Sequence, residues 1–214
     1  SGTLDLGPGA IAKTAWDWPY GGIRVRAGGV VNALGSASAP VVFTDRADGS
    51  VGGDTCGCGG PQRQYDAFTV LGGGTVNVSH ARFGWLGTAI GPAWEWPAPQ
   101  APAVVTVRDS TFTDTQRPIV NNPWYSSGAS LVLERNVFAG TSAGTGEAAV
   151  TFDSDPSGVV LAGVNTNRFT GSGRERVIVL AGSLPSGVEW NVEPHGQVLE
   201  TPGFDVHGTL DLGP

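Results

Sequence analysis

The sequence predicts an all-β chain folded as a right-handed parallel β-helix, a solenoid of about eight coils. Three observations support this prediction: abundant glycine and proline, short segments of alternating apolar residues, and a phenylalanine that recurs at similar intervals. Glycine and proline account for 34 and 15 of the 214 residues, whereas charged residues make up only 14%. Solvated amphipathic helices need more charged residues than this, so an all-α fold is disfavoured. The 40% hydrophobic content and seven tryptophans also argue against disorder.

Four segments of the chain, 76–83, 105–112, 131–138 and 160–169, align on a final phenylalanine. The phenylalanines, at positions 83, 112, 138 and 169, are separated by 29, 26 and 31 residues. Each segment starts with alternating apolar residues, which predict a strand with one buried face, and continues through a polar turn. One unit cannot bury its apolar face alone. Stacked units can, with their strands paired in parallel about 4.8 Å apart.

The remainder of the chain fits the same scheme. Short strands are expected at 2–6, 22–26, 30–34 and 41–44, and near the C-terminus at 177–180, 188–192, 198–199 and 204–206. Loops rich in tryptophan, glycine and proline separate them. Residues 1–214 are therefore expected to form one domain, a single module or one period of a longer tandem array.

The two ends of the chain carry the same seven residues. GTLDLGP occupies positions 2–8 and again 208–214. Three interpretations are open. The chain covers one period of an array plus the first strand of the next period, or both ends carry the same capping strand, or the second copy is a cloning artefact. The first interpretation is favoured. Gly9 and Ala10 follow the first copy, and in a tandem array the next period would continue in the same way after Pro214.

The N-terminal motifs carry a resemblance to a known family. The run from Gly2 to Lys13, followed by Ile23-Arg24-Val25, Ala33-Leu34-Gly35 and 39–45 (APVVFTD), resembles secreted bacterial right-handed parallel β-helix proteins of the pectate-lyase-like superfold. The resemblance covers nearly the whole chain and implies an extracellular or cell-surface location. It leaves function open, because this architecture includes lyases, hydrolases, adhesins and surface stalks.

The loop from 45 to 60 is the first candidate site. Asp45, Asp48 and Asp54 could together hold calcium, although Cys56 and Cys58 stand where the resembled family often has oxygen donors. In an exported protein a Cys56–Cys58 disulfide is the favoured fate of the cysteines, and a soft-metal site is an alternative. An ordinary surface loop is the simplest interpretation. Apart from calcium, no cofactor is expected.

Tryptophan-rich loops are the second candidate. Exposed aromatic rings beside carboxylates can stack on sugar rings and bind their hydroxyls, although such loops can also fold back over the solenoid. The residues concerned are Trp16, Asp17, Trp18, Trp94, Glu95, Trp96, Trp124 and Tyr125.

A catalytic role would require convergent carboxylates, as in glycosidases. Asp109 with Asp114, and Asp153 with Asp155, are spaced so that each pair could share a face. The sequence contains no family catalytic signature, and we assign no catalytic residue.

The favoured function is a non-catalytic structural or adhesive module that associates head to tail with neighbouring modules or copies of itself. Leu4, Leu6, Leu210 and Leu212 would form the end-to-end contact. Carbohydrate binding, or a polysaccharide lyase or hydrolase, is the alternative. The net charge of −7 and the lack of a long apolar stretch argue against nucleic acid and membrane insertion.

Overall fold

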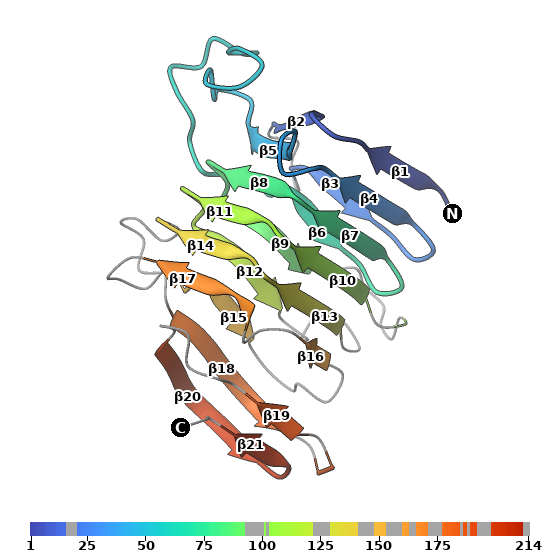
Figure 1. Cartoon of the computed structure of the whole chain (residues 1–214), viewed down its shortest axis with the longest axis vertical. Coiled ribbons are helices and arrows are strands. Elements are labelled where there is room, and N and C mark those ends of the chain that lie inside the picture. Colours follow the sequence, from blue (N-terminus) through green and yellow to red (C-terminus); the bar gives the residue numbers. More distant parts are fainter. Residues whose placement is uncertain are drawn as a thin grey trace.

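The computed structural model describes residues 1–15, 21–92, 101, 103–121, 129–140, 148–152, 160–162, 166–170, 177–184, 186–187, 189–191 and 198–211. These residues form strands and turns, with no α-helix among them. Successive strands occupy three faces in rotation, and the strand pairs between coils are all parallel within this part of the chain (Figure 1). The predicted all-β parallel β-helix is confirmed.

Each face is one sheet that runs along the solenoid. The first face contains six strands, β1 (Thr3–Leu6), β4 (Val30–Leu34), β7 (Thr75–Ser79), β10 (Ala103–Arg108), β13 (Ala129–Glu134) and β16 (Val160–Ala162). The second also contains six, β2 (Ile11–Thr14), β5 (Val41–Asp45), β8 (Ala81–Gly84), β11 (Thr111–Thr113), β14 (Val137–Ala139) and β17 (Arg168–Thr170).

The third face is the longest sheet. It contains seven strands, β3 (Ile23–Val25), β6 (Phe68–Val70), β9 (Thr88–Pro92), β12 (Arg117–Asn121), β15 (Val150–Phe152), β18 (Val177–Leu184) and β20 (Val198–Val206). The last two strands, β19 (Glu189–Asn191) and β21 (Thr209–Asp211), form a separate two-stranded sheet. Strand β20 joins the two short strands expected at 198–199 and 204–206, and its register with β18 shifts between Val179 and Ala181.

The expectation of about eight coils was too high. Within the described residues, four coils have all three strands paired on both sides, namely β4–β6, β7–β9, β10–β12 and β13–β15. The coils before and after them are paired incompletely. The estimate failed because it divided the chain evenly, whereas the connection from β5 to β6 spans residues 46–67 and adds no strand to the stack.

The recurring phenylalanines form the centre of the core. Phe43, Phe83, Phe112, Phe138 and Phe169 occupy matching positions on the second face. Their rings stack nearly parallel, with successive centroids 5.0, 4.7, 4.8 and 4.8 Å apart. The sequence alignment on phenylalanine had therefore found the inward position of this face. Such stacks stabilise the core through both buried area and ring contact.

The corner between the first and second faces is built from left-handed residues that are not glycine. His80, Asp109 and Arg135 have φ angles of 50°, 51° and 54°. A left-handed conformation costs about 1 kcal/mol for a residue with a side chain, so the corner needs compensating contacts.

Buried asparagines supply those contacts. The Asn136 side-chain oxygen accepts a hydrogen bond from the backbone N–H of Ser110 at 3.0 Å. The Asn167 side-chain oxygen likewise accepts one from the backbone N–H of Asn136 at 2.9 Å. The Asn136 amide group also donates to the Val107 carbonyl. Asn136 and Asn167 are 0% and 2% exposed, so this ladder replaces water inside the corner.

Candidate functional site

The first coil leaves the N-terminal end of the core open. Strands β1, β2 and β3 each have a neighbour on one side only among the described residues. Leu4 and Leu6 lie in register with Val31 and Ala33, which are buried, so both leucines occupy inward positions. Leu4 is nevertheless 41% exposed. Among the described residues no coil lies outside β1, so this inward apolar side chain stays exposed.

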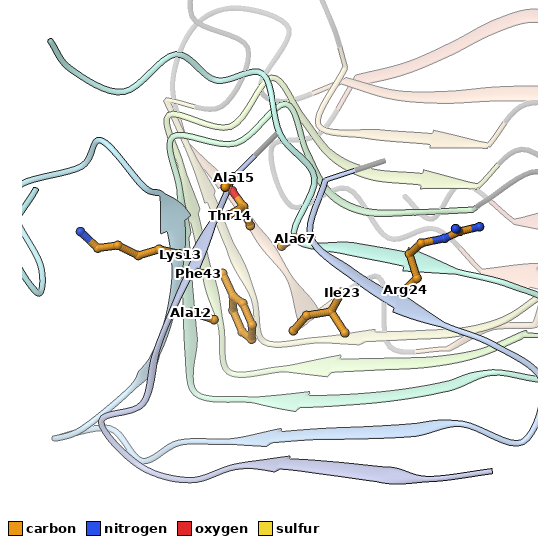
Figure 2. A pocket seen from close by; sticks show the side chains of 9 residues that line it. Ala12, Lys13, Thr14, Ala15, Ile23, Arg24, Phe43 and Ala67 are labelled. Carbon is orange, nitrogen blue, oxygen red and sulfur yellow. The ribbon is translucent and has the colours of Figure 1, made fainter. Parts of the chain in front are cut away.

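A cavity of about 440 Å³ lies between β2 and β3 in this coil. Figure 2 shows Ala12, Ile23 and Phe43 on its inner side, whereas Lys13 and Arg24 point away from it. Ala15 and Gly22 also line the cavity. The residues between them include Trp16, Asp17 and Trp18, which lie outside the described residues.

The C-terminal end of the core is similarly incomplete. Leu199, Phe204 and Leu210 pack against the core but are only partly buried. Val206 of β20 lies opposite the buried Leu184 yet is 48% exposed, and β20 is paired only with β18 in the described structure. The partly buried apolar residues that pack against the core come from the two ends: Leu6, Ala10, Ala12, Ile23, Leu199, Phe204 and Leu210.

The two ends also carry opposite charge. Residues 1–29 contain three basic residues, Lys13, Arg24 and Arg26, and two acidic ones. Residues 177–214 contain five acidic residues and no lysine or arginine. Four of those acids, Glu189, Glu200, Asp205 and Asp211, lie on the described terminal strands. Opposite charge at the two ends favours contact between unlike ends over contact between like ends.

The repeated segment occupies equivalent places at the two ends. Asp5 lies opposite Asn32 in the pairing of β1 with β4, and its carboxylate accepts a hydrogen bond from the Asn32 amide at 2.8 Å. Asp211 likewise lies opposite Asn191 in the pairing of β21 with β19. Leu4 and Leu210 each stand one residue earlier. Of the residues expected to form the end contact, Leu212 lies outside the described residues.

The acidic loop uses its carboxylates to fix its own backbone. Asp45 accepts hydrogen bonds from the amides of Ala47 and Gln62, at 2.7 and 3.2 Å. The Asp48 carboxylate accepts from the Thr44 hydroxyl and from Ser50. Burial acts to raise the pKa of Asp48, but these hydrogen bonds outweigh it, and the pKa lies below its ordinary value.

Asp54 completes this loop beside the cysteines. Its carboxylate accepts hydrogen bonds from the amides of Cys56 and Gly57, both at 2.9 Å, and these lower its pKa. Cys56 and Cys58 are joined by a disulfide. Across the described residues, no three histidine, cysteine, aspartate or glutamate side chains gather as a metal site would require. Calcium binding by Asp45, Asp48 and Asp54 stays a prediction.

The carboxylates considered for catalysis bind separate arginines. Asp109 forms a two-point ion pair with Arg135, with N–O distances of 2.7 and 2.8 Å. The hydrogen bond from Arg135 holds the pKa of Asp109 below its ordinary value. Asp114 instead pairs with Arg63 at 2.6 Å. The two aspartates therefore hold different corners of the coil, and Asp153 and Asp155 lie outside the described residues.

The sequence did not predict one surface cluster, which consists of Arg63, Trp85 and Asp114. Arg63, on the connection between β5 and β6, places its guanidinium carbon 4.8 Å from the centre of the Trp85 ring and also pairs with Asp114. Trp85 and Asp114 both follow an aligned phenylalanine by two residues and both have left-handed φ angles, of 56° and 50°. That spacing could have placed them together, but nothing in the sequence pointed to Arg63, 51 residues from Asp114.

One carboxylate near the end of this connection, Asp66, has an altered pKa. Burial raises the pKa of Asp66 above its ordinary value, although Thr88 hydrogen bonds and the charge of Arg117 partly oppose the shift.

The remaining residues expected to bind carbohydrate, Trp94, Glu95, Trp96, Trp124 and Tyr125, lie outside the described residues. Carbohydrate binding therefore stays a prediction.

Comparisons with known proteins identify no relative: no family model, curated protein or solved structure matches the chain. The described residues also include no helix with the length and apolar character needed to cross a membrane.

Proposed function

We propose that the chain is a non-catalytic structural or adhesive module of a secreted or cell-surface protein, which associates end to end with neighbouring modules or copies of itself. The main support is that apolar residues packed against the core reach both ends of the described structure and stay only partly buried there. Solenoids that work as single units need terminal coils with a polar outer side. Burying such apolar ends contributes roughly 25 cal/mol per Å² of surface removed from water.

Two further features support a head-to-tail arrangement. The strands at each end have an edge that can pair with another strand, and such edges associate unless charge or covering segments block them. Residues 1–29 carry a formal net charge of +1 and residues 177–214 one of −5, so two C-terminal ends repel one another whereas a C-terminal and an N-terminal end do not. Contacts between unlike ends build open chains of copies where the rotation between neighbours does not close a ring.

The test is the mass of the protein in solution as a function of concentration, measured by sedimentation velocity. We expect oligomers that grow with concentration and that dissociate at high salt, because salt screens the charges at the two ends. The substitution Leu4→Glu places a carboxylate on the open end and should weaken association.

Leu34→Glu is the matched control. Leu34 is 49% exposed, close to the 41% of Leu4, but it belongs to β4, a strand paired on both sides. A protein that stays monomeric at all concentrations would contradict end-to-end association. Equal losses of association in the Leu4→Glu and Leu34→Glu variants would show that the contact lies on the side of the solenoid instead.

A further inference from the structure

Strands β1 and β21 begin a coil in the same way. In chain order, each strand of the first face from β4 to β16 follows a strand of the third face, and β21 follows β20 of the third face likewise. Figure 1 shows β19 and β21 beyond β16, at the C-terminal end of the solenoid. Residues 3–5 and 209–211 are both Thr-Leu-Asp, each facing a strand that has asparagine opposite the aspartate. Strand β21 therefore occupies the place at which the sequence of β1 would start a further coil.

The third face shows which residues would meet if that coil were supplied by another copy. Ile23 of β3 and Leu199 of β20 share one row of this sheet, and the row runs through Phe68, Ile90, Ile119, Val150 and Ile178. The next row begins at Arg24 and ends at Glu200. A second copy that continued the sheet in register would place Ile23 on Leu199 and Arg24 on Glu200, joining apolar with apolar and positive with negative.

The position of β1 decides whether this contact can form. One coil adds one strand to each face, and adjacent strands lie about 4.8 Å apart. If the incoming β1 stacked on the outside of β21, the incoming β3 would lie two strand spacings, about 9.6 Å, from β20. A gap one strand wide would then remain on the third face. If the incoming β1 replaced β21 against β19, the incoming β3 would pair directly with β20.

We propose that β1 of one copy displaces β21 of the next and pairs with β19, so that Thr3, Leu4 and Asp5 lie opposite Glu189, Trp190 and Asn191. This inference rests on the end-to-end association proposed above, and it names the partner, a second copy of this chain, and the register. Strand β21 is then an internal substitute for the neighbour's first strand. It covers β19 until another copy arrives, and it weakens association because it competes from within the same chain.

Disulfide cross-linking between two differently labelled variants tests the register. Thr3→Cys in one copy should cross-link with Glu189→Cys in the other, because strand neighbours in register have Cα separations within the range that disulfides require. The described residues contain no free cysteine, so Cys56 and Cys58 do not compete. The matched alternative pairs Thr3→Cys with Thr209→Cys, which would cross-link if β1 stacked on β21. Ile11→Cys, on β2, serves as a negative control against both acceptors.

A second experiment uses the same substitution at equivalent positions of the repeat. Leu210→Glu should loosen β21 and tighten association at least about tenfold, because it weakens a competitor present at millimolar effective concentration. Leu4→Glu should weaken association by a similar factor. Hydrogen exchange of β18 and β20 checks that Leu210→Glu leaves the neighbouring face folded.

The outcomes separate this inference from the proposed function. A cross-link between Thr3→Cys and Glu189→Cys supports strand displacement if Leu4→Glu weakens association and Leu210→Glu tightens it. A cross-link between Thr3→Cys and Thr209→Cys overturns displacement but supports end-to-end association, if Leu4→Glu and Leu210→Glu both weaken association. If neither pair cross-links and no variant associates, both proposals are wrong. If Leu210→Glu associates but the unaltered chain does not, displacement holds and free association of the intact chain is refuted.

Discussion

The middle coils and the two ends of this solenoid share one pattern of inward residues but differ in how completely that pattern is buried. Phe83, Phe112 and Phe138, in the middle, are 0% exposed. Leu6 at one end and Phe204 at the other occupy inward positions and remain partly exposed. The difference follows from the number of neighbouring coils, since the residue types are alike.

This contrast locates the surface that is suited to a partner. A stacked core has no intrinsic end, so each terminal coil must be capped, continued or paired with another copy. Exposed apolar residues elsewhere, such as Leu34, lie on the outer side of paired strands and resemble ordinary surface residues. The predictions below test whether inward apolar side chains are tightly packed in the middle coils and loosely packed at the two ends, as their exposed fractions indicate.

The largest effect is expected for a phenylalanine in the ring stack. Phe112→Ala should lower the free energy of unfolding by about 3–5 kcal/mol, because it removes a buried ring and leaves a cavity between two others. The measurement is urea unfolding followed by circular dichroism. Phe204→Ala is the matched control at the C-terminal end and should cost less than half as much. Equal losses would mean that the end is as tightly packed as the middle.

The buried asparagine ladder should give the next largest effect. Asn136→Ala removes the acceptor of the Ser110 amide and leaves that buried group without its partner, at an expected cost of about 2–3 kcal/mol. Asn77→Ala is the comparison, because Asn77 donates to Asn32 from the outer side of the first face. That change should cost less than about 1 kcal/mol, since water can replace the lost partner. A larger loss for Asn77→Ala would contradict the distinction between inner and outer ladders.

A smaller effect should appear at acid pH. It concerns the ion pair between Asp109 and Arg135, which links two middle coils at their outer corner. The pKa of Asp109 lies below its ordinary value of 3.8 because of Arg135, so the folded state favours the charged form. The stabilisation is complete above the unfolded pKa and is lost as pH falls through the lower, folded value. The stability difference between the natural chain and Asp109→Asn should therefore shrink below pH 4, as followed by thermal unfolding. Arg135→Gln should show the same trend, and a difference that grows in acid would refute it.

The smallest expected effect concerns the charges at the proposed junction. Arg24→Glu should weaken association by less than about tenfold, because a single solvated ion pair contributes up to about 1 kcal/mol. Combining Arg24→Glu with Glu200→Arg should restore association, as measured by sedimentation at low salt. Recovery is the informative result. Failure of the double variant to recover would place these two residues apart in the assembly.

Much of the fold followed from local pattern. Alternating apolar residues identified the strands, and the aligned phenylalanines, such as Phe112 and Phe138, marked the inward position because every coil repeats the same environment. The number of coils could not be obtained in this way. The connection between β5 and β6 lengthens one coil without adding a strand, and local periodicity does not reveal its length.

The candidate sites were harder to predict. Carboxylates at short spacing are common both to cation sites and to turns that they hydrogen-bond themselves, so the spacing in the acidic loop does not distinguish the two. In the structure Asp45 and Asp54 accept hydrogen bonds from amides of the loop itself. The role of Arg63 depends on how the connection folds back over Trp85, which no local pattern encodes.

Local sequence pattern was enough to predict the repeating coil, the inward phenylalanines and the equivalence of the segments at 2–8 and 208–214. These are properties of short stretches, in which alternation of apolar and polar residues fixes the strand and its buried side. The folded structure was needed to show that Arg24 and Glu200 share a row, and that Leu4 is inward yet exposed. The reason is that rows and ends depend on how the lengths of all intervening connections set the register between coils.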